Sequence, residues 1–369
     1  MTRPSVPPAE QQAAEQQHAA QGDPAARATR RAPHAPSGSS HGSSHGSSVS
    51  PPGSGDVLAD PPGLLTGLRY LIPALRPKQW TKNVLLYAGF LFTLNQRWRP
   101  LSPEMWTYLR LATLGMLAFC AISSGVYLLN DVRDLPHDRA HPKKRRRPIA
   151  RGLVPVWLAL VAAVGLLGGG VYGAFALRPL FGWVGVAYVI MQVLYTLRLK
   201  HVVILDVFLI AFGFVLRAIS GAIVIYAEIS PWLYIVTFLG ALFLGLCKRR
   251  HELLLLAGDA GRHRRILEEY TIEMLDQMIG IVTASTIMAY SLYTFSAPSL
   301  SVNHVPNHLM MATIPHVLYG MFRYLYLVHR HNGGGSPEET LLRDRPLIVA
   351  ILLWVATAAS ILLWGRTPA

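Results

Sequence analysis

From about residue 61 onward, long apolar runs alternate with short polar connections. A helix needs about 20 predominantly apolar residues to cross the roughly 30 Å hydrocarbon core of a bilayer. Nine runs meet or approach this length, at approximately residues 80–96, 108–130, 154–176, 179–199, 202–226, 231–250, 275–296, 310–329 and 345–364. The pattern therefore predicts an all-α, polytopic membrane protein with nine transmembrane helices.

Residues 1–60 differ in composition from the segment that follows, which contains the first predicted span. The first predicted span is the weakest, because its apolar run VLLYAGFLFTL is short, and the amphipathic stretch GLLTGLRYLIPALRPKQW before it predicts an interfacial helix. Residues 1–60 are rich in Pro, Ala, Gly, Ser and His and contain almost no large aliphatic side chain. We therefore expect a disordered tail without a signal peptide over residues 1–60 and a transmembrane domain over 61–369.

Composition narrows the class of protein further. Apolar residues make up 51% of the chain and charged residues 15%, which excludes a disordered or ordinary soluble protein. The only two cysteines lie inside apolar runs, which excludes a disulfide framework and a multi-cysteine metal site. The net charge of +14 accompanies membrane spans, so we expect the lipid bilayer as the anionic partner and no nucleic acid.

Lys and Arg gather on alternate connections, most densely in RDLPHDRAHPKKRRRPIARG and CKRRHELLLLAGDAGRHRR. Cytoplasmic loops of membrane proteins retain positive charge. The distribution therefore predicts a cytoplasmic N-terminus, an external C-terminus and a strongly basic cytoplasmic face.

The most specific pattern is NDxxDxxxD at the end of the second predicted span, formed by Asn130, Asp131, Asp134 and Asp138. On a helix the three aspartates fall on one face, where they repel each other and oppose the helix dipole. A nearby cation is expected to offset both effects. Basic side chains of the next loop would do so structurally, whereas Mg²⁺ suits hard oxygen ligands completed by water and substrate phosphates.

A basic loop follows this motif directly. Its seven cationic residues are Arg139, Lys143, Lys144, Arg145, Arg146, Arg147 and Arg151. Carboxylates beside a basic loop suit a metal-bridged diphosphate, whose remaining oxygens the bases neutralise. The alternative for the basic run alone is a signal that sets membrane orientation.

Further charged residues lie in or beside the spans. Asp206 and Arg217 fall within one predicted helix, about three turns apart, so each needs a partner other than the other. Charges inside spans are costly and usually line a cavity. In CKRRHE, Lys248 and Glu252 could form a helix-surface pair, or the bases could form an anion site facing the aspartates.

Together, NDxxDxxxD, RPIARG and the nine predicted spans resemble the UbiA superfamily of intramembrane prenyltransferases over about residues 68–365. The resemblance implies a UbiA-type helical bundle whose Mg²⁺, held by two aspartate-rich motifs on the cytoplasmic side, binds a prenyl diphosphate. Here KRRHE stands where the second motif, DxxxD, is expected.

This departure, with RPKQWTKN at 76–83 and YTLRLKHVVILDVFLIAFGFVLRAISGA at 195–222, is similar to decaprenyl-phosphate phosphoribosyltransferases. That branch transfers 5-phosphoribose from PRPP to polyprenyl (decaprenyl) phosphate, toward lipid-linked arabinose for cell-envelope polysaccharide. The resemblance implies a bacterial inner membrane and a cytoplasmic active site. Donor and acceptor together carry more phosphate than a prenyl diphosphate, which favours more cations and fewer carboxylates.

Roles for individual residues follow as hypotheses from this resemblance and the charge pattern. Catalysis is expected from Asp131, Asp134 and Asp138, and Mg²⁺ binding from the same three with Asn130. Contacts to PRPP are expected from Lys82, Tyr127, Asn130 and Lys144. Contacts to the acceptor phosphate are expected from Lys200, Arg217, Lys248 and Arg249.

Two alternatives remain open at this level. A prenyltransferase acting on an aromatic acceptor would retain the first motif but should carry a second acidic one. A transporter would explain intramembrane charge and should show inverted repeats with broken helices. The acceptor's chain length and the oligomeric state, a homo-oligomer included, are not determined by the sequence.

Overall fold

The computed structural model describes residues 64–94, 97–141, 144–228, 231–256, 265–296, 309–330 and 334–364. The chain divides into two units, Met1–Val57 and Leu58–Ala369, and every described residue belongs to the second. The predicted N-terminal tail lies outside the described residues. Within the described ranges the secondary structure is helical, without a β-strand, as the hydrophobic pattern predicts.

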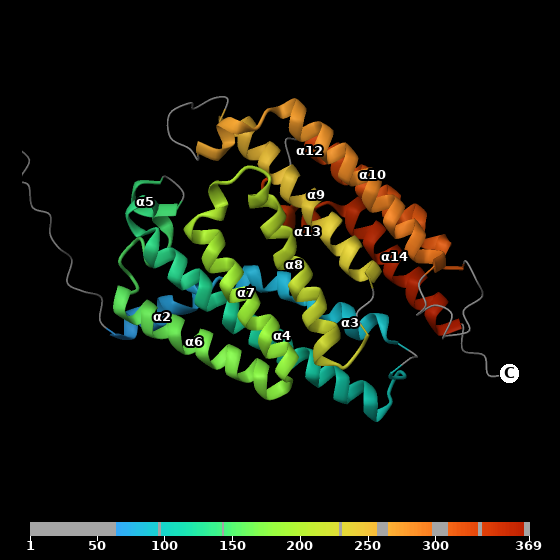
Figure 1. Ribbon diagram of the computed structural model, residues 1–369, viewed down its shortest axis with the longest axis horizontal. Coiled ribbons are helices and arrows are strands. Elements are labelled where there is room, and N and C mark those ends of the chain that lie inside the picture. Colours follow the sequence, from blue (N-terminus) through green and yellow to red (C-terminus); the bar gives the residue numbers. More distant parts are fainter. Residues whose placement is uncertain are drawn as a thin grey trace, which may run out of the picture. The chain divides into compact units, whose positions relative to one another are not determined.

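The N-terminal half of the described chain contains the elements that carry the acidic motif (Figure 1). They are α2 (Leu64–Ala74), η1 (Pro77–Leu86), α3 (Tyr87–Phe92), α4 (Pro103–Arg133), α5 (Leu135–Ala140), η2 (Lys144–Arg146), α6 (Val156–Leu177), α7 (Pro179–Leu197) and η3 (Leu199–His201), where η denotes a 3₁₀ helix. The C-terminal half follows with α8 (Leu205–Val224), α9 (Pro231–Leu256), η4 (Arg265–Glu269), α10 (Ile272–Ser296), η5 (Leu309–Thr313), α12 (Ile314–Arg330), α13 (Pro337–Arg343) and α14 (Arg345–Trp364).

Six of the described helices are long and apolar enough to cross a membrane: α4, α6, α7, α8, and most of α10 and α14. They make the chain a multi-pass membrane protein. Helices α9 and α12 coincide with the predicted spans 231–250 and 310–329 but are not among these six. The expected number of nine transmembrane helices is therefore not confirmed.

The first predicted span, residues 80–96, is not among the six membrane-crossing candidates in the described part of the chain, so this span is not confirmed. Its residues form the end of η1 and the six-residue α3. Both elements pack on α8, and a Cβ atom built on Gly221 of α8 would lie 1.9 Å from the carbonyl oxygen of Leu86. Leu86 has no exposed surface. The run is thus partly buried: Leu86 and Phe90 lie in the core, whereas Val84 and Leu91 are exposed.

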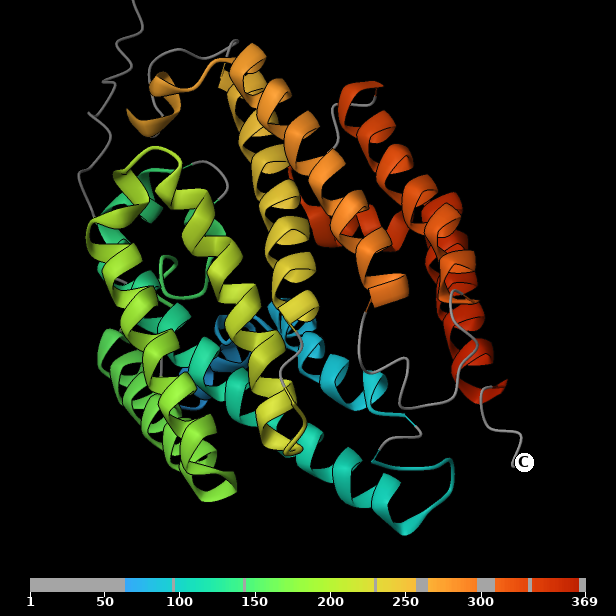
Figure 2. The ribbon, with the colours of Figure 1, turned by 45° about the vertical axis from the view of Figure 1, so that its right-hand side comes forward.

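Helix α8 joins two groups of helices. At its C-terminal end, Ile223 and Val224 share an apolar core with Phe119 of α4 and Tyr188 of α7, and at its N-terminal end Val207 packs in a second core with residues of α9, α10 and α12. Figure 2 shows α9 running between α8 and α10. Cys120 and Cys247 are buried and free, as expected for core residues.

Candidate active site

The acidic motif lies where α4 ends and the chain turns into α5. Helix α4 ends at Arg133, Asp134 caps it, and Pro136 occupies the first turn of α5. The motif is thus not on one continuous helix as expected. Asn130 and Asp131 are on α4, Asp134 is at the junction, and Asp138 is on α5.

Arg147, at the end of the basic loop, brings two of the aspartates together. Its Nη1 donates to Asp131 Oδ1 at 3.1 Å and to Asp138 Oδ2 at 2.5 Å. Both carboxylates are almost completely buried, with side-chain exposures of 4% and 3%. The two carboxylates therefore converge on one positive group in the protein interior.

Two further cations complete the charge balance. Arg76 forms an ion pair with Asp131, and Lys200 Nζ in η3 lies 3.9 Å from Asp134 Oδ1, whose side chain is 38% exposed. The cluster of Asp131, Asp134 and Asp138 is thus matched by Arg76, Arg147 and Lys200. We call these six residues the balanced cluster.

Arg76 was missed as a site residue, and the tertiary structure explains how it reaches the motif. It adopts a left-handed backbone conformation (φ 57°) between α2 and Pro77, and its guanidinium lies 5.0 Å from the ring centre of Tyr127. The junction is fastened to α4 because Trp80 Nε1 donates to Ser124 Oγ, which donates to the carbonyl of Leu75, both at 3.0 Å. In the sequence, Arg76 was marked only as the first residue of the segment RPKQWTKN, which resembles the decaprenyl-phosphate phosphoribosyltransferases.

Two of the predicted donor-binding residues, Asn130 and Tyr127, lie on α4 beside members of the balanced cluster. Asn130 accepts a hydrogen bond from Thr196 Oγ1 of α7 at 3.0 Å, which links α7 to the motif. Tyr127 lies under Arg76. Lys82 lies on η1 and Lys144 on η2, the two short elements that carry or flank Arg76 and Arg147.

The donor set fits a hard divalent cation. Asp131 and Asp138 already bracket a positive group, and their ligand atoms are oxygens, which Mg²⁺ prefers. Among the described residues, no group of three or more His, Cys, Asp or Glu side chains is gathered so as to hold a metal ion. A metal here would take its remaining ligands from water and substrate phosphates, as is usual for Mg²⁺.

Arg217 lies in a different place from the balanced cluster. It is 4% exposed, and it donates from Nε to Asn83 Oδ1 and from Nη2 to Tyr188 Oη, each at 2.7 Å. Asn83 in turn contacts Ser123, which precedes Asp131 on α4 by eight residues, or about 12 Å of helix. These contacts join α8, through Arg217, to η1 and α7.

Arg249 forms a second buried network. Its Nε donates to Asp206 Oδ2 at 2.7 Å, and its Nη1 contacts Glu252. The expectation that Asp206 has a partner other than Arg217 is confirmed. Glu252 pairs with Arg249, the residue that follows Lys248.

Tyr270, the residue directly after η4, completes this network. Its hydroxyl donates to Asp206 Oδ1 at 2.9 Å and accepts from the backbone N–H of Ile204 at 2.6 Å. Burial raises the pKa of Tyr270 to about 12, so the phenol stays protonated and keeps donating at neutral pH. Of the four predicted acceptor-binding residues, only Lys200 contacts the acidic motif in the contacts described above.

Comparison with known proteins identifies a family whose profile matches most of the chain, and named relatives of similar length. Residues 98–342 match the profile of the UbiA prenyltransferase family. The chain is 34% identical over 315 residues to a decaprenyl-phosphate phosphoribosyltransferase from Mycobacterium tuberculosis, covering 85% of this chain and 100% of the relative. It is 35% identical over 296 residues to the protein of that name from Corynebacterium glutamicum, covering 77% and 84%.

Solved structures agree at the level of fold. A UbiA homologue from Archaeoglobus fulgidus bound to DMAPP and Mg²⁺ superimposes with a TM-score of 0.60 at 18% identity, covering 80% of this chain and 99% of that chain. The same homologue bound to GPP and Mg²⁺ gives a TM-score of 0.59. The helical arrangement is therefore that of UbiA proteins.

Proposed function

The chain belongs to the UbiA prenyltransferase family, and we propose that it transfers 5-phosphoribose from PRPP to a polyprenyl (decaprenyl) phosphate, releasing diphosphate. The observation that carries the proposal is the balanced cluster, in which three carboxylates, two of them buried, meet three cations. Relatives of 34% and 35% identity named decaprenyl-phosphate phosphoribosyltransferases support it.

The donor is assigned to the balanced cluster. Asp131, Asp134 and Asp138, with Asn130, would hold Mg²⁺, and the chemistry that a bound Mg²⁺ supplies is neutralisation of charge on the departing diphosphate. Arg147 and Arg76 already pair with these carboxylates, so their positive charge is close to where diphosphate charge develops. Lys82, Tyr127 and Lys144 would contact the rest of PRPP.

The acceptor is assigned to the side of the cluster on which Lys200 lies. A polyprenyl phosphate is an anionic nucleophile near neutral pH, so it needs no strong general base. Lys200 contacts Asp134 and is the best placed of the predicted acceptor ligands. Lys248 and Arg249 remain further candidates, and the contacts of Arg217 favour a structural role.

The replacement of the second acidic motif favours this branch over aromatic prenyl transfer. In KRRHE the single carboxylate, Glu252, is paired with Arg249. A second metal-carboxylate clamp would need this side chain. Positive charge on alternate connections supports a site on the cytoplasmic side of the membrane. In this proposal the membrane is the bacterial inner membrane, and the product supplies lipid-linked arabinose.

The test is a transfer assay with the purified full-length protein in detergent, radiolabelled PRPP, decaprenyl phosphate and Mg²⁺. Label is expected to enter the organic phase, to depend on the metal, and to fall at least 100-fold in Asp138→Asn, because that carboxylate is proposed to hold the metal. Glu339→Gln is the control, since its carboxylate is 61% exposed on α13.

The alternatives give different results. Consumption of a prenyl diphosphate with an aromatic acceptor, and no transfer from PRPP, would replace the proposal by prenyl transfer. Inactivity with both donors would favour the transporter.

A further inference from the structure

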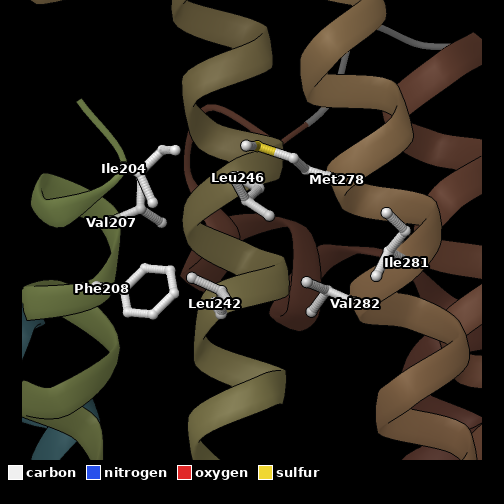
Figure 3. A pocket seen from close by; sticks show the side chains of 8 residues that line it. All are labelled: Ile204, Val207, Phe208, Leu242, Leu246, Met278, Ile281 and Val282. Atoms are coloured by element: carbon white, nitrogen blue, oxygen red, sulfur yellow. The ribbon is translucent and has the colours of Figure 1, made fainter.

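An apolar groove runs beside α9, between α8 and α10 (Figure 3). Ile204 and Phe208 form one side, Leu246 the floor, and Met278 and Ile281 the other side. All eight lining residues are apolar, and the cavity has a volume of about 170 Å³. Ile281 is 67% exposed and Ile204 39% exposed, so the groove is open along its rim.

The size and lining of the groove suit one branched hydrocarbon unit. An enclosed cavity of roughly 150 Å³ lined by Leu, Ile and Phe stays dry and binds benzene. An isoprene unit has one carbon fewer than benzene, so the cavity of about 170 Å³ can hold about one such unit. The open rim would let the rest of a long chain continue along the helices.

The groove begins close to the balanced cluster. Ile204 follows Lys200 by four residues, and Lys200 Nζ is 3.9 Å from Asp134 Oδ1. Four virtual Cα–Cα bonds span at most about 15 Å. A lipid whose phosphate lies at Lys200 would therefore have its first isoprene units within reach of the groove.

The wall at Ile204 is held rigidly. Ile204 has a φ of 68°, which is strained for a β-branched residue and persists only where the surroundings enforce it. The enforcing contacts are the hydrogen bond from its N–H to Tyr270 and the bond from Tyr270 to Asp206. Asp206 is fixed in turn by Arg249.

Rigidity matters because burial of apolar surface gives no hydrophobic driving force inside a bilayer, where lipid tails are equally apolar. A chain is selected there by packing against fixed side chains. Ile204, held in its strained conformation by hydrogen bonds, thus gives the open apolar groove a fixed side against which a lipid chain can pack.

We infer that the groove between α8, α9 and α10 binds an isoprene unit of the acceptor lipid close to its phosphate. The inference rests on the proposed function for the identity of the lipid. It adds a tail subsite, formed by Ile204, Phe208, Leu246, Met278 and Ile281, to the phosphate site at Lys200.

The test uses the full-length protein in nanodiscs and a polyprenyl phosphate that carries a diazirine near its phosphate. Photolabel is expected in the α10 peptide, and decaprenyl phosphate, but not dipalmitoyl phosphatidic acid, should compete. Ile281→Trp, which fills the groove, should lower this labelling about tenfold and raise the KM for decaprenyl phosphate while leaving the KM for PRPP unchanged. Val164→Trp on α6, also at an exposed position (68%), is the matched control.

Each outcome decides the inference. Labelling of other helices with transfer intact would overturn the subsite and leave the proposed function standing. Equal competition by phosphatidic acid would assign the groove to ordinary bilayer lipid and overturn it. Labelling of α10 that decaprenyl phosphate competes, in a protein that transfers nothing from PRPP, would support the groove and reject the proposed function.

Discussion

At the scale of single residues, Arg147 is the side chain that joins the two buried carboxylates of the acidic motif. Asp131 and Asp138 lie in the protein interior, where two like charges without a partner are costly. One guanidinium nitrogen contacts both carboxylates. The same arrangement holds the two carboxylates close together, which a cation site requires.

Replacement of Arg147 by Gln is therefore expected to destabilise the fold. Breaking a buried pair costs about 3–5 kcal/mol, and we expect roughly 1–3 kcal/mol here because the Arg147 side chain is 28% exposed and partly screened. Thermal unfolding in detergent measures the change. The double variant Asp138→Asn/Arg147→Gln should recover part of the loss, since it removes one unpaired charge.

The control for this prediction is Arg145→Gln in the same basic loop, where the side chain is exposed. It should unfold at the wild-type temperature. An equal loss in Arg145→Gln, or no recovery in the double variant, would mean that the loop charge as a whole, and not the Arg147 contacts, sets the stability.

At the scale of elements, the crossing of η1 and α8 fixes the position of the segment that precedes α3. Gly221 lets the two backbones touch, because any side chain there would meet the carbonyl of Leu86. Arg217, one turn earlier on α8, donates to Asn83 on η1. The crossing thus anchors the segment that carries Arg76 and Lys82 beside the acidic motif.

Gly221→Ala is expected to destabilise the protein, because its Cβ would lie 1.9 Å from the backbone oxygen of Leu86. Overpacking usually costs about 1–3 kcal/mol, and more when backbone atoms must move. Gly165→Ala on α6 is the matched control, since its Cβ would meet nothing within 4 Å and Ala favours a helix. Unfolding temperatures of the two variants should move in opposite directions, and equal shifts would contradict the crossing.

At the scale of the whole described unit, α8 holds the two helix groups together. Its C-terminal half belongs to the core with α4 and α7, and its N-terminal half to the core with α9 and α10. The pair between Asp206 on α8 and Arg249 on α9 is buried, with side-chain exposures of 0% and 3%. This pair orients α9 and supports the strained Ile204 through Tyr270.

Asp206→Asn should leave Arg249 with one of its two carboxylate partners and destabilise the protein by about 3–5 kcal/mol, the usual cost of breaking a buried pair. Denaturant unfolding in detergent measures this. The exposed pair between Arg343 and Glu339 is the control, and Arg343→Gln should change stability by about 0–1 kcal/mol. Similar losses in both variants would show that Asp206 is not the link between the groups.

Part of the fold and of the site was predictable from local patterns. Apolar length predicted α4, α6, α7, α8, α10 and α14, because a helix that faces lipid must be apolar along its whole length. The spacing of Asp131, Asp134 and Asp138 and the basic loop after them predicted a charged cluster. The roles of the individual residues in binding PRPP, Mg²⁺ and the acceptor remain predictions.

The sequence by itself determined the helical membrane fold, the family and the place of the acidic motif, since these depend on runs and spacings within a few turns. The tertiary structure alone decided which polar side chains meet. Arg76 contacts Asp131 across 55 residues, Thr196 contacts Asn130 across 66, and Arg217 contacts Asn83 across 134. Such contacts depend on how helices cross, and helix crossings are set by packing between distant surfaces, which local spacing does not record.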